Sequence, residues 1–431
     1  MQPQALPGFR DFYPAELALR DHLFRTWRQL AARYGFEEYD GPPLEPLELY
    51  TAKSGQEIVG QLYSFTDKGG REVSLRPEMT PTLARMVAAR ATVFKKPIRW
   101  FSIPQLFRYE RQQRGRLREH FQLNCDLIGE SGPLADAEII ALAIDAVRTF
   151  GLGPGDIRVR VSDRRLLSAM LSGLGIGEAE RPLVYQVFDK IRRAPEATSV
   201  ARLAEADVSS ATIDRLLQLT RVRSWTELEG LGDGLDSALR QGDGLRQAIA
   251  GLSAMGFGEY LDLDLGIVRG LAYYTGTVFE LFDAGGELRA ICGGGRYDNL
   301  LQSLGGVDLP ALGFGMGDVV LGELLRDRGL APNAPAGIEV FVAGITPDDV
   351  PHVLALAREL REASFRVEYA LSPQAVGKQL QLAGARRAGY AVVVGPDDRA
   401  RGEVMLKDLR GKDQSAIARG ELLGRLTSLL R

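Results

Sequence analysis

Cysteine and histidine are scarce in this chain of 431 residues. The two cysteines, Cys125 and Cys292, are too few for a disulfide framework and indicate a reducing compartment. The three histidines, His22, His120 and His352, lie far apart and form no cluster with the spacing of zinc ligands. We therefore expect no metal site built from protein side chains alone. Magnesium carried by a nucleotide stays possible, because it needs only one or two carboxylates.

Long apolar runs are also missing. No run of about 18 apolar residues occurs, so the sequence predicts no membrane span. The first residues, MQPQALPGFRDFYP, lack the apolar core of a signal peptide, and we expect a cytoplasmic protein. No charge of one sign dominates, because 53 basic and 56 acidic side chains give a formal net charge of −3. The length predicts about three domains.

Two familiar phosphate-binding signatures are absent. The chain contains no GxxxxGK[ST] sequence, which excludes a P-loop. The stretch GFGMGD at 313–318 has glycine at its first, third and fifth places, which is the wrong spacing for a dinucleotide-binding fingerprint. We interpret these small residues as allowing a strand and a helix to approach closely.

Positive charge nevertheless gathers in one stretch, RYERQQRGRLREHFQLNCD at 108–126. The residues before it predict a buried strand, and those after it a half-buried strand with Gln122, Asn124 and Asp126 on one face. Gly115 supplies a turn between them. Such a charged run is usually a solvated loop. A hairpin with an arginine-rich tip and a polar floor would instead suit a polyanion, because guanidinium groups match phosphate.

The pattern along the chain predicts a sheet that is split in sequence. Region 164–255 is rich in Leu, Ala, Arg and Glu, and we interpret it as a helical insertion. Strand patterns in 1–163 and 256–330 then belong to one antiparallel sheet. After a proline-rich linker, strands and helices alternate over 337–431, which predicts a small α/β domain.

Three further stretches contain candidate site residues. VRGLAYYTGTVFE places Arg269 among apolar residues, followed by Tyr273 and Tyr274. It is either a strand with one exposed arginine or a cleft in which that arginine faces an anion. The glycines of AICGGGRYDNL (290–300) allow close approach of a ligand, or merely a tight turn. SLRPEMTP (74–81) puts a glutamate at the mouth of a helix, where it could bind an amine.

Together these stretches resemble the histidyl-tRNA synthetase family of class II aminoacyl-tRNA synthetases, over essentially the whole chain. FRYERQQRGRLREHFQ resembles motif 2, and YDGPPLE resembles the end of motif 1, with Pro42 as its proline. RGLAYYTGTVFE and AICGGGRYD resemble the two histidine signatures, and GKQLQLAGARRAGYAVVVG resembles the anticodon-binding domain. The resemblance implies an α+β fold: a class II antiparallel sheet flanked by helices, with a helical insertion and a C-terminal α/β anticodon-binding domain.

The implied function is that of a histidine–tRNA ligase, which activates histidine with ATP to histidyl-adenylate and transfers it to tRNA(His). The implied partners are ATP with Mg²⁺ as a substrate complex, histidine, tRNA(His) and a second copy in a homodimer. Arg108 would bind the α-phosphate, Arg116 the γ-phosphate end, and Glu110 would lie beside the adenine. The loop tip would face the tRNA acceptor end through three residues: Arg111, Gln113 and Arg114.

The resemblance also assigns a histidine pocket. Its implied residues are Glu78 and Thr80 at the α-amino group, Gln122 at the carboxylate, Asp126 at the imidazole, and Arg269, Tyr273 and Tyr274 around them. Arg269 and Arg108 would be catalytic, because the attack of a carboxylate on a phosphate brings two anions together. Positioned cations lower that barrier.

Two departures from the family pattern leave an alternative open. Ala272 stands where the family has aspartate, and Val319 and Val320 stand where motif 3 has a Glu–Arg pair that contacts ATP. The alternative is a non-catalytic paralogue, such as the regulatory subunit of ATP phosphoribosyltransferase, which binds histidine without charging tRNA. Such paralogues typically lack the anticodon-binding domain, so its presence here favours the enzyme.

Overall fold

The computed structural model describes residues 4–51, 59–111, 113–191, 195–231, 236–267, 274–286, 288–332, 337–411 and 413–431. No helix within these ranges combines the length and the apolar character that crossing a membrane requires. Contacts divide the chain into two compact units, Met1–Pro332 and Asn333–Arg431.

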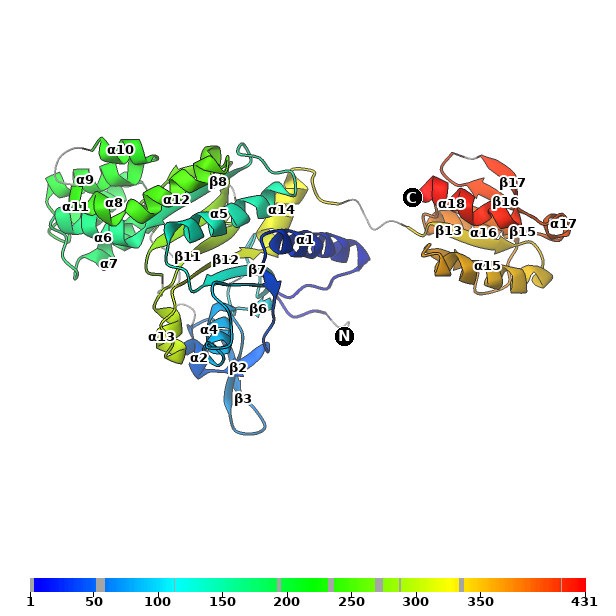
Figure 1. Ribbon diagram of the computed structural model, residues 1–431, viewed down its shortest axis with the longest axis horizontal. Helices are drawn as coiled ribbons and strands as arrows, with labels where there is room; N and C mark the ends of the chain where they lie inside the picture. Colours follow the sequence, from blue (N-terminus) through cyan, green and yellow to red (C-terminus); the bar gives the residue numbers. More distant parts are fainter. Residues whose placement is uncertain are drawn as a thin grey trace. The chain divides into compact units, whose positions relative to one another are not determined.

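A nine-stranded sheet forms the centre of the first unit (Figure 1). The strands follow the order β1-β5-β7-β12-β11-β10-β8-β9, and β6 pairs with β7. Their bounds are β1 Glu37–Glu38, β5 Ile98–Ser102, β6 Gln105–Phe107, β7 Glu119–Ile128, β8 Ile157–Asp163, β9 Leu261–Leu263, β10 Thr277–Asp283, β11 Cys292–Arg296 and β12 Ala311–Gly317.

The predicted sheet, split in sequence and flanked by helices, is confirmed, with one correction. The strands from β5 to β8 in that order pair antiparallel, whereas β1 pairs with β5, and β8 with β9, in parallel. The sheet is therefore mixed. Long connections join the strands of both parallel pairs, and such connections allow parallel pairing where a short hairpin does not.

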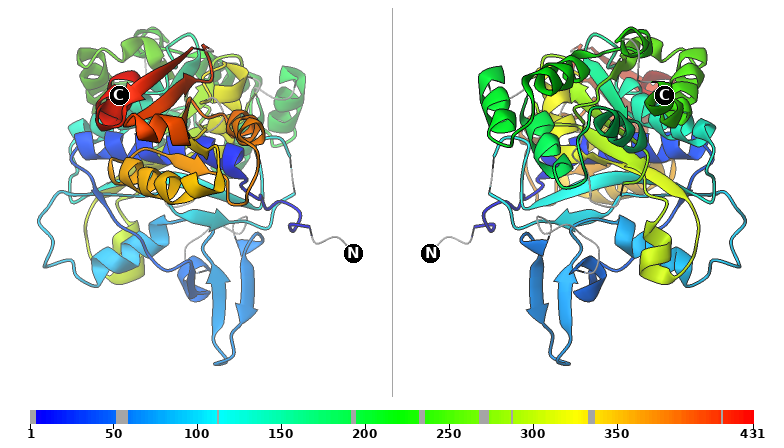
Figure 2. Two further views of the ribbon diagram at one scale, coloured as in Figure 1. Left: turned by 90° about the vertical axis from the view of Figure 1, so that its right-hand side faces the viewer. Right: turned by 90° about the vertical axis from the view of Figure 1, so that its left-hand side faces the viewer.

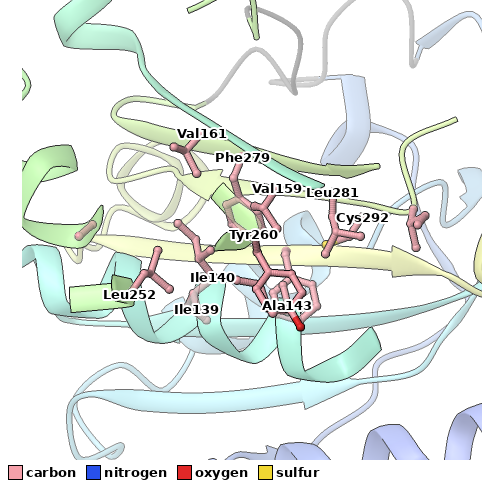
Figure 3. Close-up of a cluster of buried hydrophobic side chains, with 14 of the residues drawn as sticks. Ile139, Ile140, Ala143, Val159, Val161, Leu252, Tyr260, Phe279, Leu281 and Cys292 are labelled. Atoms are coloured by element: carbon pink, nitrogen blue, oxygen red, sulfur yellow. The ribbon is translucent and has the colours of Figure 1, made fainter. Parts of the chain in front are cut away.

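One face of this sheet is apolar and covered by helices. Side chains of β8, β10 and β11 meet those of α5 (Pro133–Arg148) and α12 (Asp243–Ala254) in a buried cluster (Figure 3). The labelled members are Ile139, Ile140, Ala143, Val159, Val161, Leu252, Tyr260, Phe279, Leu281 and Cys292. Helices α1 (Pro14–Arg33) and α14 (Asp318–Asp327) contribute buried residues to the same cluster.

A smaller layer lies on the other side of the central sheet (Figure 2). It contains a three-stranded antiparallel sheet in the order β2-β4-β3 and the helices α2, α4 and α13. The bounds are β2 Leu44–Pro46, α2 Glu48–Thr51, β3 Tyr63–Thr66, β4 Glu72–Leu75, α4 Thr80–Ala88 and α13 Leu300–Gly305. Helix α4 follows β4 after a short turn.

The region that links β8 to β9 contains helices and no strand among its described residues. Figure 1 shows most of these helices gathered at one end of the first unit, whereas α12 lies beside α5. They are α6 Arg164–Gly173, α7 Arg181–Lys190, α8 Glu196–Ala204, α9 Ser210–Arg221, α10 Trp225–Glu229, α11 Asp236–Gln241 and α12. Asp163 caps α6, because its carboxylate accepts from the backbone N–H groups of Arg165 and Leu166.

The second unit is the predicted small α/β fold. Its sheet has the order β14-β13-β15-β16-β17, with the first three strands parallel and the last two antiparallel. Valine and leucine side chains of the sheet pack on α15 and α18. The bounds are β13 Val340–Gly344, α15 Val350–Glu362, β14 Val367–Tyr369, α16 Val376–Ala385, β15 Tyr390–Val394, α17 Pro396–Ala400, β16 Glu403–Asp408, β17 Gln414–Ala418 and α18 Leu422–Leu430.

Candidate active site

The second face of the central sheet is polar along part of β7. Gln122, Asn124 and Asp126 alternate along β7 with buried apolar residues. The neighbouring strand β12 places Gly313 opposite Asp126 and Gly315 opposite Asn124. A Cβ atom at Gly315 would come within 2.5 Å of the side chain of Gln122, and one at Gly313 would collide with Asp126 Oδ1. These glycines therefore leave room for polar side chains of β7 to lie across β12. This explains the glycines of GFGMGD better than close packing of a strand and a helix does.

A cavity opens over this polar floor. Six of the residues that the sequence analysis assigned to histidine or ATP line it: Glu78, Thr80, Arg108, Gln122, Asp126 and Tyr274. The lining also includes Asn124, Tyr297, Gly293 of β11, and Gly313 and Gly315 of β12. Residues far apart in the sequence thus meet in one place. Arg269, Ala272 and Tyr273 lie outside the described residues.

Asp126 is a buried carboxyl group of the cavity whose pKa is raised. It is 3% exposed, and burial raises its pKa to about 7, against a smaller opposing effect of Tyr297. The hydroxyl of Tyr297 donates a hydrogen bond to Asp126 Oδ1. Sequence reasoning did not assign Tyr297, although it follows the glycines of the stretch AICGGGRYDNL. A carboxyl that titrates near neutral pH can exchange a proton with an imidazole.

The stretch SLRPEMTP divides between a structural and a cavity role. Arg76 is buried, and its guanidinium donates to Asp40 Oδ1 at 2.8 Å and to Gly41 O at 2.7 Å, which anchors the chain after α1. Glu78 is 3% exposed and lines the cavity, where α4 begins at Thr80. A buried carboxylate at this position can accept hydrogen bonds from an ammonium group.

The motif 2 stretch forms the predicted hairpin. β6 and β7 are paired, and Gly115 has a φ of +73°, which suits glycine in the turn. Arg108 faces the cavity and donates from Nε to Pro77 O at 2.9 Å. Arg116 forms an ion pair with Glu110.

The loop tip is less free than its charge indicates. Arg114 pairs with Glu323 at 3.2 Å and with Asp327 at 3.0 Å, both on α14. Gln113 accepts a hydrogen bond from Arg289. Arg111 is exposed. Both arginines predicted to contact nucleic acid are thus exposed, and Arg114 is already paired with α14.

The departure at Val319 and Val320 lies beside this loop. Val320 is buried, and its Cγ2 would be 3.2 Å from a Cβ atom at Gly115. The space next to the loop is therefore filled by an apolar side chain. The preceding Asp318 is buried and accepts from Phe121 N at 2.8 Å.

Arg10, which the sequence analysis did not assign to the site, also contacts Asp318. Arg10 donates to Glu119 Oε1 at 2.6 Å and to Asp318 Oδ2 at 2.9 Å. Burial, Arg108 and Arg10 together lower the pKa of His120 to about 3, so this imidazole is neutral. Sequence reasoning had no signal for Arg10 beyond the mixed charges of GFRDF near the N-terminus.

The part of the chain that the structure describes contains no group of three or more His, Cys, Asp and Glu side chains that could hold a metal ion. The cavity instead combines the guanidinium group of Arg108 with buried carboxylates and tyrosine side chains. Such a set can bind a molecule that carries anionic, cationic and ring hydrogen-bonding groups together.

Comparison with known proteins identifies the family. A family model described as "Histidyl-tRNA synthetase" matches residues 8–317, and one described as "Anticodon binding domain" matches residues 339–429. The chain belongs to the histidyl-tRNA synthetase family. A family member from Opitutus terrae, named histidine–tRNA ligase, is 47% identical over 424 residues, which cover 97% of each chain.

Solved structures of the family share the architecture. The crystal structure of histidyl-tRNA synthetase from Nostoc sp. PCC 7120 superposes with a TM-score of 0.86 at 25% identity, and the match covers 100% of both chains. A structure from Bacillus halodurans C, described as an ATP phosphoribosyltransferase regulatory subunit/histidyl-tRNA synthetase, has a TM-score of 0.77 at 23% identity. It covers 91% of this chain and 98% of its own, and it shows the fold alone.

Proposed function

We propose that the protein is a histidine–tRNA ligase, which makes histidyl-adenylate from histidine and ATP and transfers the histidyl group to tRNA(His). The supporting observation is the cavity, where buried carboxylates and Arg108 meet over a polar floor in a member of this family. The family relationship over 97% of the chain supports catalysis more than the non-catalytic alternative.

Within this proposal, the carboxylates select histidine. Glu78 holds the α-ammonium group, with Thr80 beside it, and Gln122 holds the carboxylate. Asp126, oriented by Tyr297, hydrogen-bonds a ring N–H. A buried polar partner discriminates strongly, because an amino acid that cannot form the bond leaves the carboxyl unpaired.

Cations promote the first step. The histidine carboxylate oxygen attacks the α-phosphorus of ATP, the bond from phosphorus to the bridging oxygen breaks, and pyrophosphate leaves. We assign the α-phosphate to Arg108 and the γ-phosphate end to Arg116, with Glu110 beside the adenine. By resemblance, Arg269 stabilises the attacking carboxylate, and Tyr273 and Tyr274 form the pocket wall. Preorganised cations of this kind are typically the largest source of rate enhancement.

Magnesium fits this site only as a companion of ATP. The described residues offer no cage of three acidic or histidine ligands, so the triphosphate would supply most of its coordination. Bound there, magnesium would neutralise phosphate charge.

The second half-reaction needs tRNA. We propose that Arg111, Gln113 and Arg114 meet the acceptor end and that residues 337–431 bind the anticodon. Arg114 would have to exchange its partners on α14 for phosphate. By resemblance we also propose a cytoplasmic homodimer, with 1–163 and 256–330 as the catalytic core and 164–255 as its insertion.

Exchange of labelled pyrophosphate into ATP tests the activity. We expect exchange that depends on histidine and is not supported by other amino acids. Aminoacylation of tRNA(His) would then test the second step. A pure protein that binds histidine but supports no exchange would contradict the proposal and favour the non-catalytic paralogue.

A further inference from the structure

Arg164 joins the helical region to the edge of the cavity. It is the first residue of α6 and directly follows Asp163, the last residue of β8. Its backbone N–H donates to Gly276 O at 3.0 Å, and its guanidinium Nη1 donates to Tyr274 O at 3.0 Å. Asp163 already pairs with Thr277 in the sheet. Arg164 thus extends the pairing beyond the end of β8 and holds the segment that leads into β10.

The held segment carries a wall of the cavity. Tyr274 lines the cavity together with Glu78 and Tyr297. Burial, and secondly Glu78, raise the pKa of the Tyr274 hydroxyl, so it stays protonated. Because Arg164 holds the backbone carbonyl of Tyr274, it restrains the direction in which the ring leaves the backbone.

The position of Arg164 has a local cost. A positive charge in the first turn of a helix opposes the helix dipole. Burial also lowers the pKa of the Arg164 guanidinium, an effect that Tyr185 and Tyr274 partly offset. The carboxylate of Asp163 is engaged by Arg165 N at 2.7 Å as the helix cap. Helix stability alone therefore does not favour arginine at this position.

We infer that Arg164 is a positioning residue for the amino-acid end of the cavity and that it acts by holding Tyr274 in place from the helical region. The inference rests on the proposed function, in which Tyr274 forms a wall of the histidine pocket. The helical region would then contribute to the histidine pocket, because Arg164, the first residue of that region, holds Tyr274.

The test compares Michaelis constants for the two substrates of pyrophosphate exchange. In Arg164→Ala we expect the histidine KM to rise about tenfold or more, because small displacements of positioning groups have large effects. The ATP KM should stay within about twofold, because Arg108 and Arg116 are untouched. Arg164→Lys should recover part of the loss, since an ammonium group can still donate one hydrogen bond to the carbonyl.

Arg221→Ala is the matched control. Arg221 forms an exposed ion pair with Glu196 at 2.8 Å within the same helical region, and exposed pairs contribute little stability. This variant should keep both Michaelis constants. If Arg164→Ala does not fold, Arg164→Lys is decisive, and its histidine KM should rise at least about threefold.

The outcomes separate the two proposals. An active wild type whose Arg164 variants keep the histidine KM would overturn this inference alone, as would an equal rise in both Michaelis constants. A wild type without exchange would overturn the proposed function. In that case calorimetric titration with histidine decides the inference: a loss of affinity in Arg164→Ala supports it, and unchanged or absent histidine binding overturns it.

Discussion

The two faces of the central sheet are formed by the same strands but differ in their surroundings: one packs against helices and the other lines a cavity. On one face, Val159, Val161, Phe279 and Leu281 are buried under α5 and α12. On the other face, alternate residues of strand β7 line an open cavity. A strand alternates its side chains between faces, so a change of one position along it moves a substitution from stability to chemistry. Stability and activity should therefore respond to different residues of the same sheet.

The largest effect should come from a cation on the polar side. Arg108→Ala should slow histidine-dependent pyrophosphate exchange by about 10²- to 10³-fold, as loss of one preorganised donor does. Its melting temperature should change little, because the described contact of its guanidinium is a single hydrogen bond to Pro77 O. Single-turnover adenylate formation and a thermal melt measure the two quantities. A large fall in melting temperature would contradict the expectation that Arg108 contributes to activity and not to stability.

The complementary change removes a ring from the apolar face. Phe279 is 2% exposed, and Phe279→Ala should lower the free energy of unfolding by about 3–5 kcal/mol. The folded fraction should keep a nearly normal histidine KM. Urea denaturation and exchange assays at low temperature test this. A histidine KM that rises as much as in polar-face variants would show that the two faces are coupled.

The stability difference between wild type and Asp126→Asn should depend on pH. The folded-state pKa of Asp126, about 7, lies above the unfolded value of about 4. Stability from this raised pKa is fully present below pH 4 and is lost as pH rises towards 7. At pH 8 the wild type therefore buries an unfavourable charge that the Asp126→Asn variant lacks.

We accordingly expect Asp126→Asn to raise the melting temperature relative to wild type more at pH 8 than at pH 5. At pH 8, where Asp126 is charged, the same change should also raise the histidine KM by about tenfold or more, because a charged partner becomes neutral. Thermal melts and exchange kinetics across this range check both parts. A stability difference that does not vary with pH would contradict the titration of Asp126.

The smallest effect should come from the loop tip. The side chain of Arg114 is 61% exposed, so Arg114→Ala should change stability by less than about 1 kcal/mol despite its two partners on α14. Adenylate formation should be nearly unchanged, whereas aminoacylation should weaken and depend less on salt. Comparison of the two half-reactions at about 50 and 200 mM salt checks this. Equal losses in both would place Arg114 with the ATP-binding residues.

Much of the fold followed from local patterns. The helical region, the split sheet and the α/β order of the second unit could be predicted because periodicity and turn residues act over short distances. The same alternation correctly predicted that Gln122, Asn124 and Asp126 share one face of a strand. The parallel edge pairs could not be predicted, since strand direction at an edge depends on where a long connection returns.

Local sequence patterns are enough to predict the kinds of strand and helix, the family motifs and the polar side of β7. The contacts that these residues make depend on the tertiary structure. Tyr297 reaches Asp126 across 171 positions, and Arg10 reaches Asp318 across 308. The glycines of β12 matter because register sets them opposite Asp126 and Asn124. Periodicity reports which way a side chain points, whereas contacts between distant segments depend on strand order and register, which no local pattern encodes.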